Sequence, residues 1–358
     1  MIVFILGTTA EAIKIAPIVR RLDAQDIPYR IWLTLQHTTA LRKILPSLGF
    51  HEPDEIIANG KNGEPLRSAA DAAFWLVTIL RWSFNRSRSL RRELPKNSIV
   101  VVHGDTMTSV VGALIAKRLG LRCAHVEAGL RSGNWRHPFP EELDRRIVGK
   151  LAAIHYTPSE EATQNLRSRP NVIWTHGNTA VDAVLDQAES NETAAEKYGV
   201  VLLHRYEFLA NKELVASTLK TLATETPFPL HFFVDEYAKE TLSGTLPTAD
   251  SDMIRIQEKL KHEDFISLLK NSQFIVTDSG GIQAEAALLG IPTLIHRMAT
   301  EQREGLGENI SLSGWDIGVL SAFLGNSDKY RRPSSRPKFS PSDIIVDDLL
   351  TRSITRGA

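Results

Sequence analysis

Short apolar runs alternate along the chain with longer segments in which apolar residues recur at helical spacing. Such helical segments cover residues 11–22, 108–119 and 282–289. A regular alternation of β-rich runs and amphipathic helices predicts parallel sheets with helices on both faces. The apolar runs are residues 3–6, 29–33, 99–102, 123–126, 153–156, 172–175, 200–203, 230–234, 254–256, 274–277 and 293–295.

The strand series divides into two, and a chain of 358 residues is too long for one ordinary core. We therefore expect an α/β protein with two Rossmann-like, doubly wound domains facing a cleft. Their expected bounds are 1–176 and 177–340, followed by a helix or tail at 341–358. In folds of this kind, ligands bind at the carboxyl ends of the strands.

Composition narrows the class of protein. Lys plus Arg and Asp plus Glu both number 42, and this balance argues against a nucleic-acid-binding protein. A single cysteine, Cys123, cannot form a disulfide framework or a four-ligand zinc site. The first residues lack the pattern of a signal peptide, and the later apolar segment 69–80 is shorter than the about 20 residues that cross a bilayer. We therefore expect a cytoplasmic protein with no stable membrane insertion.

A predicted helix at 68–94 has a basic second half. Its aromatic residues lie among arginines, so two interpretations stay open: a surface or dimer-facing helix, and a helix that contacts a membrane surface. These aromatic residues are Phe74, Trp75, Trp82 and Phe84.

Three carboxylates follow predicted strands or begin a predicted helix of the first domain. Asp105 and Glu127 come directly after strands, and Glu141 lies near a helix start behind two prolines. Carboxylates gathered at one sheet edge cannot all ionise freely, so their pKa values should separate, as acid/base chemistry requires. The alternatives are capping of the following helix by Asp105 or Thr106, a capping role for Glu141, and a structural salt bridge of Glu127 with His125 or Arg131.

Two turns between a strand and a helix are candidate anion sites. Gly7 precedes the first helix, which carries Lys14 about two turns in, although the Gly-x-Gly-x-x-Gly fingerprint is absent. In the second domain, Ser279, Gly280 and Gly281 open a helix whose amides could bind a diphosphate, and Glu285 could reach ribose hydroxyls. A plain tight turn is the alternative at both places.

His204 ends a predicted strand of the second domain. There it could titrate near neutrality and take part in proton transfer, or it could be a solvated loop histidine.

These segments together resemble the non-hydrolysing UDP-N-acetylglucosamine 2-epimerases, whose architecture is of the GT-B type. The resemblance extends over roughly residues 1–320 in order and spacing. It rests on Gly104-Asp-Thr, His125-Val-Glu-Ala-Gly-Leu-Arg, Pro140-Glu-Glu with Arg145, Gly177-Asn-Thr, His204-Arg and Asp278-Ser-Gly-Gly-Ile-Gln with Glu285.

The resemblance implies a mechanism without a metal or nicotinamide cofactor. A base removes the C2 proton while UDP leaves C1, and return of the proton to the other face gives UDP-N-acetylmannosamine. The catalytic set would be Asp105, Glu127, Glu141 and His204. Substrate and nucleotide would be held by Lys14, Arg131, Arg145, Phe265, Ser279, Gly280, Gly281, Glu285, Gln302 and Arg303. A homodimer is implied by resemblance alone.

The residues expected to bind the nucleotide depart from the family pattern, whereas the expected acid/base residues are retained. Thr9 and Gln302 stand where the family has arginines, although Arg303 is shifted by one position from the second, and Leu260 replaces a glutamine. These departures suggest a different nucleotide or sugar. Three alternatives therefore stay open: a hydrolysing epimerase, a GT-B glycosyltransferase and a catalytically silent binding protein.

Overall fold

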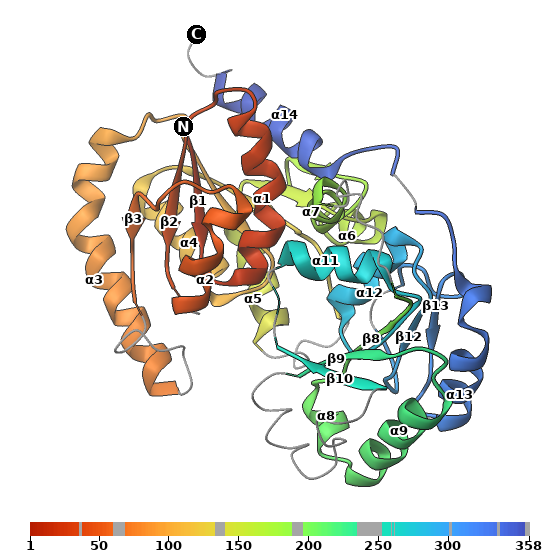
Figure 1. Cartoon of the computed structure of the whole chain (residues 1–358). Coiled ribbons are helices and arrows are strands. Elements are labelled where there is room, and N and C mark those ends of the chain that lie inside the picture. Colours follow the sequence, from red (N-terminus) through yellow and green to blue (C-terminus); the bar gives the residue numbers. More distant parts are fainter. Residues whose placement is uncertain are drawn as a thin grey trace. The chain divides into compact units, whose positions relative to one another are not determined.

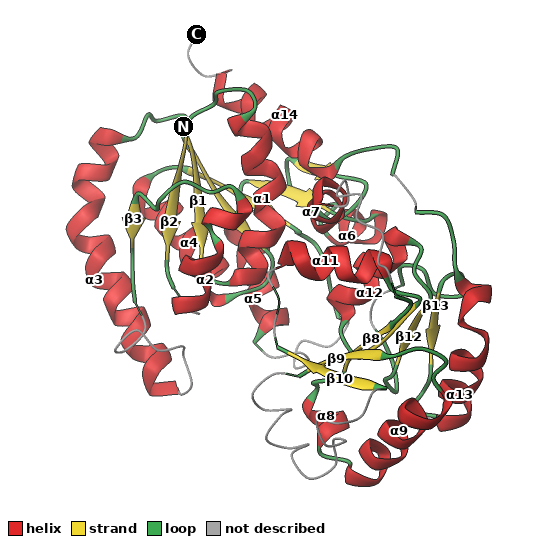
Figure 2. Cartoon of the chain, viewed as in Figure 1, coloured by secondary structure: helices red, strands yellow, loops and turns green. Residues whose placement is uncertain are grey.

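The computed structural model divides into two compact units. Unit 1 comprises Met1–Ala183 together with Lys338–Ala358, and unit 2 comprises Val184–Pro337. Each is built of one parallel sheet and surrounding helices (Figure 2). The structure describes residues 1–35, 38–59, 69–132, 140–187, 196–234, 253–258, 260, 262–300, 303–334 and 337–354.

The sheet of unit 1 has the strand order β3-β2-β1-β4-β5-β6-β7, and all its neighbouring strands are parallel. The order reverses between β1 and β4, which is the topological switch point where ligands bind in doubly wound folds. The strands are β1 (Ile2–Leu6), β2 (Tyr29–Leu33), β3 (Glu55–Ile56), β4 (Ile99–His103), β5 (Arg122–Val126), β6 (Ile154–Thr157) and β7 (Val172–Trp174).

Helices cover this sheet on both faces because successive side chains of its strands point to opposite sides. On β1, Phe4 joins the core under α1, whereas Val3 and Ile5 join the core under α3 and α4. The helices are α1 (Thr9–Asp23), α2 (Thr38–Ile44), α3 (Ala69–Glu93), α4 (Met107–Leu119), α5 (Glu141–Leu151), α6 (Glu160–Asn165), α7 (Ala180–Gln187) and α14 (Pro341–Ile354).

The terminal helix α14 belongs to unit 1 and lies beside α1 (Figure 1). Ile345, Val346 and Leu349 are buried in the same core as α1. The hydroxyl of Tyr156 on β6 donates to Asp348 over 2.8 Å. The sequence predicted this helix but not the domain that it completes.

The sheet of unit 2 repeats the same arrangement, with the order β10-β9-β8-β11-β12-β13 and parallel pairing throughout. Its switch point lies between β8 and β11. The elements are β8 (Gly199–Leu202), α8 (Tyr206–Leu209), α9 (Lys212–Glu225), β9 (Leu230–Phe233), β10 (Ile254–Gln257), α11 (His262–Asn271), β11 (Phe274–Thr277), α12 (Gly280–Leu289), β12 (Thr293–Ile295), β13 (Ile310–Leu312) and α13 (Ile317–Asn326).

Every strand predicted from an apolar run is present, and the predicted two-sheet α/β fold is confirmed. The strands missed are β3 and β13, which are edge strands of two and three residues with partly exposed side chains and therefore little apolar signal. Residues 189–198, whose polar sequence predicts a helix, lie largely outside the described residues. Among the described helices, none is long and apolar enough to span a membrane.

Candidate active site

The predicted site residues of each unit gather at the switch point of its own sheet. In unit 1, Gly7 follows β1, Asp105 follows β4 and Glu127 follows β5. In unit 2, His204 follows β8 and Ser279 follows β11. Parallel strands place these positions at one edge of each sheet, where doubly wound folds bind their ligands.

Glu127 is held by two basic side chains of unit 1. Lys14 donates from Nζ to Oε2 of Glu127 over 2.7 Å, and Nε2 of His103 lies 3.1 Å from the same oxygen. The backbone of Glu127 has φ of 65°, a left-handed conformation that costs a residue with a side chain about 1 kcal/mol or more. Strain of this kind persists where the surrounding structure fixes a functional side chain.

These contacts keep Glu127 ionised. Burial alone would raise its pKa, but the Lys14 ammonium and His103 outweigh burial and hold the pKa well below the usual 4.5. At neutral pH the side chain is therefore a carboxylate that can accept a proton. The predicted salt bridge exists, but with Lys14 rather than His125 or Arg131, and Lys14 was expected to contact the nucleotide.

The turn after β1 is a capped turn of the protein itself, in line with the alternative of a plain tight turn. The buried carboxylate of Glu11 accepts hydrogen bonds from the amides of Gly7 and Thr8 over 2.7 and 2.8 Å. Thr8 returns the bond by accepting from the amide of Glu11, which completes a capping box. The chain's own carboxylate thus occupies two amides of this turn.

Asp105 and Glu141 do not act as helix caps. Thr106 caps α4 by accepting from the amide of Ser109, whereas Asp105 pairs with Arg145 of α5. Glu141 is the first residue of α5, and its Oε2 is buried without a hydrogen-bond partner among the described residues. The predicted cap of α4 is therefore made by Thr106 rather than by Asp105, and the N-cap position of α5 is Pro140 rather than Glu141.

Glu142 organises the arginines of this region, and sequence reasoning missed its role. It is 0% exposed and accepts from the amide of Ser132 over 3.1 Å and from Nε of Arg146 over 2.9 Å. Arg145 and Arg131 lie 3.5 and 4.0 Å from its carboxylate. Burial opposes ionisation, but these partners lower the pKa of Glu142. The signal was present as arginines three and four residues after the second glutamate of the Pro-Glu-Glu motif.

His125 is not placed to act as a general acid or base. Its Nε2 bonds the carbonyl of Gly104 over 2.7 Å, and burial lowers its pKa to about 3. His155 pairs with it in register on β6, and burial lowers the pKa of His155 to about 4. Both rings are neutral at physiological pH. The histidine that lies beside Glu127 is His103, which the sequence analysis did not identify.

In unit 2, the backbone around His204 is fixed by Asp278. This aspartate is 0% exposed and accepts from the amides of His204 and Arg205 over 2.9 Å each. Its second oxygen lies 3.0 Å from Nδ1 of His204, whose side chain is 38% exposed. An aspartate on the far nitrogen of an accessible histidine orients the ring for proton transfer at Nε2. From the sequence, Asp278 was identified only as the first residue of the Asp-Ser-Gly-Gly-Ile-Gln segment.

The start of α12 leaves room for a ligand to approach its amides. Ser279 is the N-cap, and its side chain makes no capping hydrogen bond. At Gly281, φ is not left-handed, and an added Cβ would meet nothing nearer than 3.8 Å. Neither backbone conformation nor packing within unit 2 requires glycine there, which is consistent with the predicted binding of a phosphate at this helix start.

The other nucleotide-binding candidates are dispersed over unit 2. Phe265 on α11 packs edge-on against Phe233, and Glu285 is half-buried on α12. Arg303 is exposed, and its amide donates to Glu304 over 3.1 Å. Gln302 lies outside the described residues.

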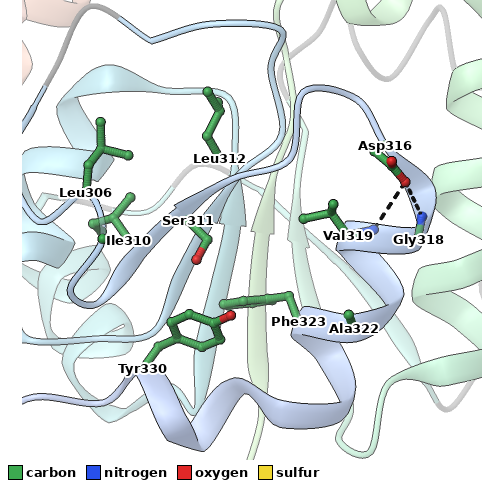
Figure 3. A pocket seen from close by; sticks show the side chains of 11 residues that line it. Leu306, Ile310, Ser311, Leu312, Asp316, Gly318, Val319, Ala322, Phe323 and Tyr330 are labelled. Carbon is green, nitrogen blue, oxygen red and sulfur yellow. Dashed lines mark hydrogen bonds between the residues drawn. The ribbon is translucent and has the colours of Figure 1, made fainter.

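A hollow of about 550 Å³ lies elsewhere in unit 2, along β13 and α13. It is lined largely by apolar side chains such as Leu312 and Phe323 (Figure 3). Its one acidic lining residue, Asp316, caps α13 by accepting from the amides of Gly318 and Val319. None of the predicted site residues lines it.

Comparison with known proteins decides the family. The family model for UDP-N-acetylglucosamine 2-epimerase matches residues 85–313. The chain belongs to the UDP-N-acetylglucosamine 2-epimerase family. It is 32% identical to the UDP-N-acetylglucosamine 2-epimerase of Bacillus subtilis (strain 168) over an alignment of 375 residues, which covers 97% of this chain and 94% of the relative.

Solved structures of the family have the same two-domain α/β fold of the GT-B type. The UDP-GlcNAc 2-epimerase of Methanocaldococcus jannaschii matches with a TM-score of 0.77 and 26% identity, covering 98% of this chain and 99% of that chain. A structure of that enzyme in complex with UDP-GlcNAc and UDP matches with a TM-score of 0.72 and 28% identity over the same shares. The predicted resemblance is thus confirmed, and the glycosyltransferase and hydrolase alternatives are not favoured.

Proposed function

We propose that this chain interconverts UDP-N-acetylglucosamine and UDP-N-acetylmannosamine by eliminating UDP and adding it back. Membership of the 2-epimerase family supports this activity. The observation that carries it is the ionised carboxylate of Glu127, fixed at the switch point of unit 1 by Lys14 and His103. A positioned carboxylate can accept the proton that the first step releases.

The reaction balances without a cofactor. A base takes the proton from C2, the electrons of that C–H bond form the C1–C2 double bond, and the C1–O bond breaks with its electrons going to UDP. A proton then returns to the opposite face of C2 while a phosphate oxygen of UDP bonds to C1 again. We assign these two proton transfers to the carboxylates of unit 1, Asp105, Glu127 and Glu141.

The electrostatics of unit 1 support this assignment. Glu127 is held as a carboxylate, and Arg145 lies against Asp105. Because the C2 proton is weakly acidic, most of the barrier must be lowered by groups that are already oriented before the substrate arrives. The strained backbone of Glu127 and the ion pairs of α5 provide that orientation.

Unit 2 would supply the nucleotide site and one proton-transfer group. The amides at the start of α12 and the small side chains there suit the diphosphate of UDP. His204, oriented by Asp278, would take part in proton transfer, with Phe265, Glu285 and Arg303 as further contacts of the substrate.

A homodimer is the assembly that we propose. The helix α3 buries Trp75 and Ile79 but exposes an apolar stripe, at one end of which the guanidinium of Arg118 lies 3.9 Å from the ring centroid of Phe84. A contiguous exposed apolar surface marks an interaction site in soluble proteins. The stripe comprises Phe74, Val77, Leu80 and Phe84. We also propose a cytoplasmic location.

Product analysis tests the proposed activity. Purified protein is incubated with UDP-N-acetylglucosamine, and the sugar nucleotides, free sugars and UDP are separated and quantified. The proposal expects UDP-N-acetylmannosamine with little free sugar, and loss of this product in Glu127→Gln but not in the exposed control Glu161→Gln. Free N-acetylmannosamine with stoichiometric UDP would show hydrolysis instead.

A further inference from the structure

A fourth carboxyl group lies in the same region as the acid/base carboxylates of unit 1. Asp144 follows Glu141 by one turn of α5 and is only 6% exposed. Its Oδ2 has no hydrogen-bond partner among the described residues, and the same holds for Oε2 of Glu141. A buried carboxylate without a partner is costly, whereas a protonated carboxyl loses much of that cost.

The charges around Asp144 are mainly negative. Burial and, to a smaller extent, the carboxylates of Asp105 and Glu141 together raise the pKa of Asp144 to about 7. The neighbouring Arg145 is already engaged with Asp105 and Glu142. Among the described residues, no cation of α5 forms an ion pair with Asp144, and Arg146 is paired with Glu142.

The elements that pack against α5 do not change this balance. On α4, charged side chains occur only in the last turn, at Lys117 and Arg118. On β5, the titratable groups besides buried Cys123 are Arg122, which donates to the carbonyl of Arg352, and the neutral His125. No ion pair joins Asp144 to any of these within the part of the chain that the structure describes.

We propose that Asp144 is a positioning residue of the acid/base site: a buried neutral carboxyl group that limits the negative charge beside Asp105 and Glu141, so that an anionic sugar nucleotide can bind. This inference rests on the proposed function. Sequence reasoning did not single out Asp144.

Ionisation of Asp144 should weaken substrate binding. Above about pH 7 the group loses its proton and adds one negative charge to a site that must accept a diphosphate. Such a like charge should weaken the affinity about fivefold. Asp144→Asn keeps the shape of the neutral carboxyl at every pH, so its affinity should not fall in this range.

Folding stability gives a readout that is independent of the ligand. The pKa is about 7 in the folded protein and 3.8 ordinarily, so the folded state binds more protons between these values. The free energy of unfolding therefore falls as the pH rises through this window, and the loss is complete above pH 7. Asp144→Asn lacks this loss, so its advantage in Tm over the parent protein should grow from about pH 5 to about pH 8.

The experiment compares the full-length protein with Asp144→Asn and with Asp347→Asn, an exposed aspartate of α14. Binding of UDP-N-acetylglucosamine is measured by calorimetry from about pH 6 to about pH 9, and Tm is measured over about pH 5 to 8. The expected result is a binding affinity that falls with pH in the parent and in Asp347→Asn but not in Asp144→Asn, with a widening Tm gap.

Other outcomes overturn the inference, and they do so separately from the proposed function. Parallel affinity profiles in parent and Asp144→Asn would show that Asp144 does not control binding, even if the epimerase reaction occurs. A Tm gap that is constant with pH would show that Asp144 holds no extra proton. If the parent does not bind the sugar nucleotide at any pH, the proposed function fails, and a widening Tm gap would then leave Asp144 protonated but without a role in binding.

Discussion

The ammonium of Lys14 lies 2.7 Å from the carboxylate of Glu127 and joins the first helix of unit 1 to the end of its fifth strand. The two residues are partly buried, with side-chain exposures of 29% and 15%, so solvent screens the pair only in part. Lys14 is therefore placed to stabilise the carboxylate of the proposed base.

Replacing Lys14 should impair the proposed base. Its ammonium helps to hold the pKa of Glu127 below 4.5, so Lys14→Met should raise that pKa and move the acid limb of the activity profile to higher pH. We expect kcat at neutral pH to fall about tenfold or more. Steady-state kinetics against pH check this, with the exposed Lys220→Met as control. An acid limb at the same pH in Lys14→Met would contradict the pairing.

Glu142 should act mainly on stability. Glu142→Ala leaves the guanidinium groups around it uncompensated and should lower the free energy of unfolding by about 3 kcal/mol at neutral pH. Because the pKa of Glu142 is lowered in the fold, its contribution is present above pH 4.5 and is lost as the pH falls through the folded value. Denaturant titrations of Glu142→Ala and the exposed control Glu161→Ala measure the difference, and equal stabilities would refute it.

Asp278 should matter for turnover more than for binding. Asp278→Asn keeps an acceptor for the backbone amides but removes the charge beside Nδ1 of His204. We expect kcat to fall about a hundredfold while KM changes little, since a general acid or base contributes at least this factor. Kinetics of Asp278→Asn beside the exposed Asp264→Asn test this. A rise in KM with unchanged kcat would assign Asp278 to binding instead.

A substitution at Gly281 should change ligand binding without changing folding stability. An added methyl group meets no atom closer than 3.8 Å, so Gly281→Ala should leave Tm unchanged or slightly raised. If a phosphate approaches the amides of α12 closely, the methyl group will hinder it, and the Kd for UDP should rise about tenfold. Gly325→Ala on α13 is the matched control, since a Cβ there meets nothing within 4 Å. Unaltered UDP affinity in Gly281→Ala would place the diphosphate elsewhere.

The exposed stripe of α3 predicts the assembly state. Val77 is 62% exposed at its centre, so Val77→Glu should convert a homodimer into a monomer without unfolding unit 1. Light scattering coupled to size-exclusion chromatography measures the mass, and Asn85→Glu on the same helix is the control for added charge. A monomeric parent protein at micromolar concentration would refute the dimer.

The fold could be predicted from sequence because its strands are buried and continuous. Runs such as residues 99–102 and 274–277 give an apolar signal that does not depend on their neighbours, whereas β3 and β13 are short and half-exposed at sheet edges. The position of α14 could not be predicted, because only tertiary packing against α1 places this helix in unit 1.

The sequence predicted which site residues follow the strand ends, but not the side chains with which they form ion pairs and hydrogen bonds. Asp105 and Glu127 followed from the rule that carboxylates after parallel strands gather at one edge. Whether Lys14 would pair with Glu127 or remain free depends on distances that no spacing encodes, and the same is true of Glu11 at the first turn. The buried state of Asp144 depends on which face of α5 packs inward.

The measurement that tests the central claim most directly is proton NMR of the purified protein with UDP-N-acetylglucosamine in deuterated water. Elimination and re-addition predict that deuterium enters at C2 in both sugar nucleotides while signals of UDP-N-acetylmannosamine appear, and that Glu127→Gln abolishes both changes. A folded protein that neither exchanges the C2 proton nor forms the epimer would contradict the proposed function.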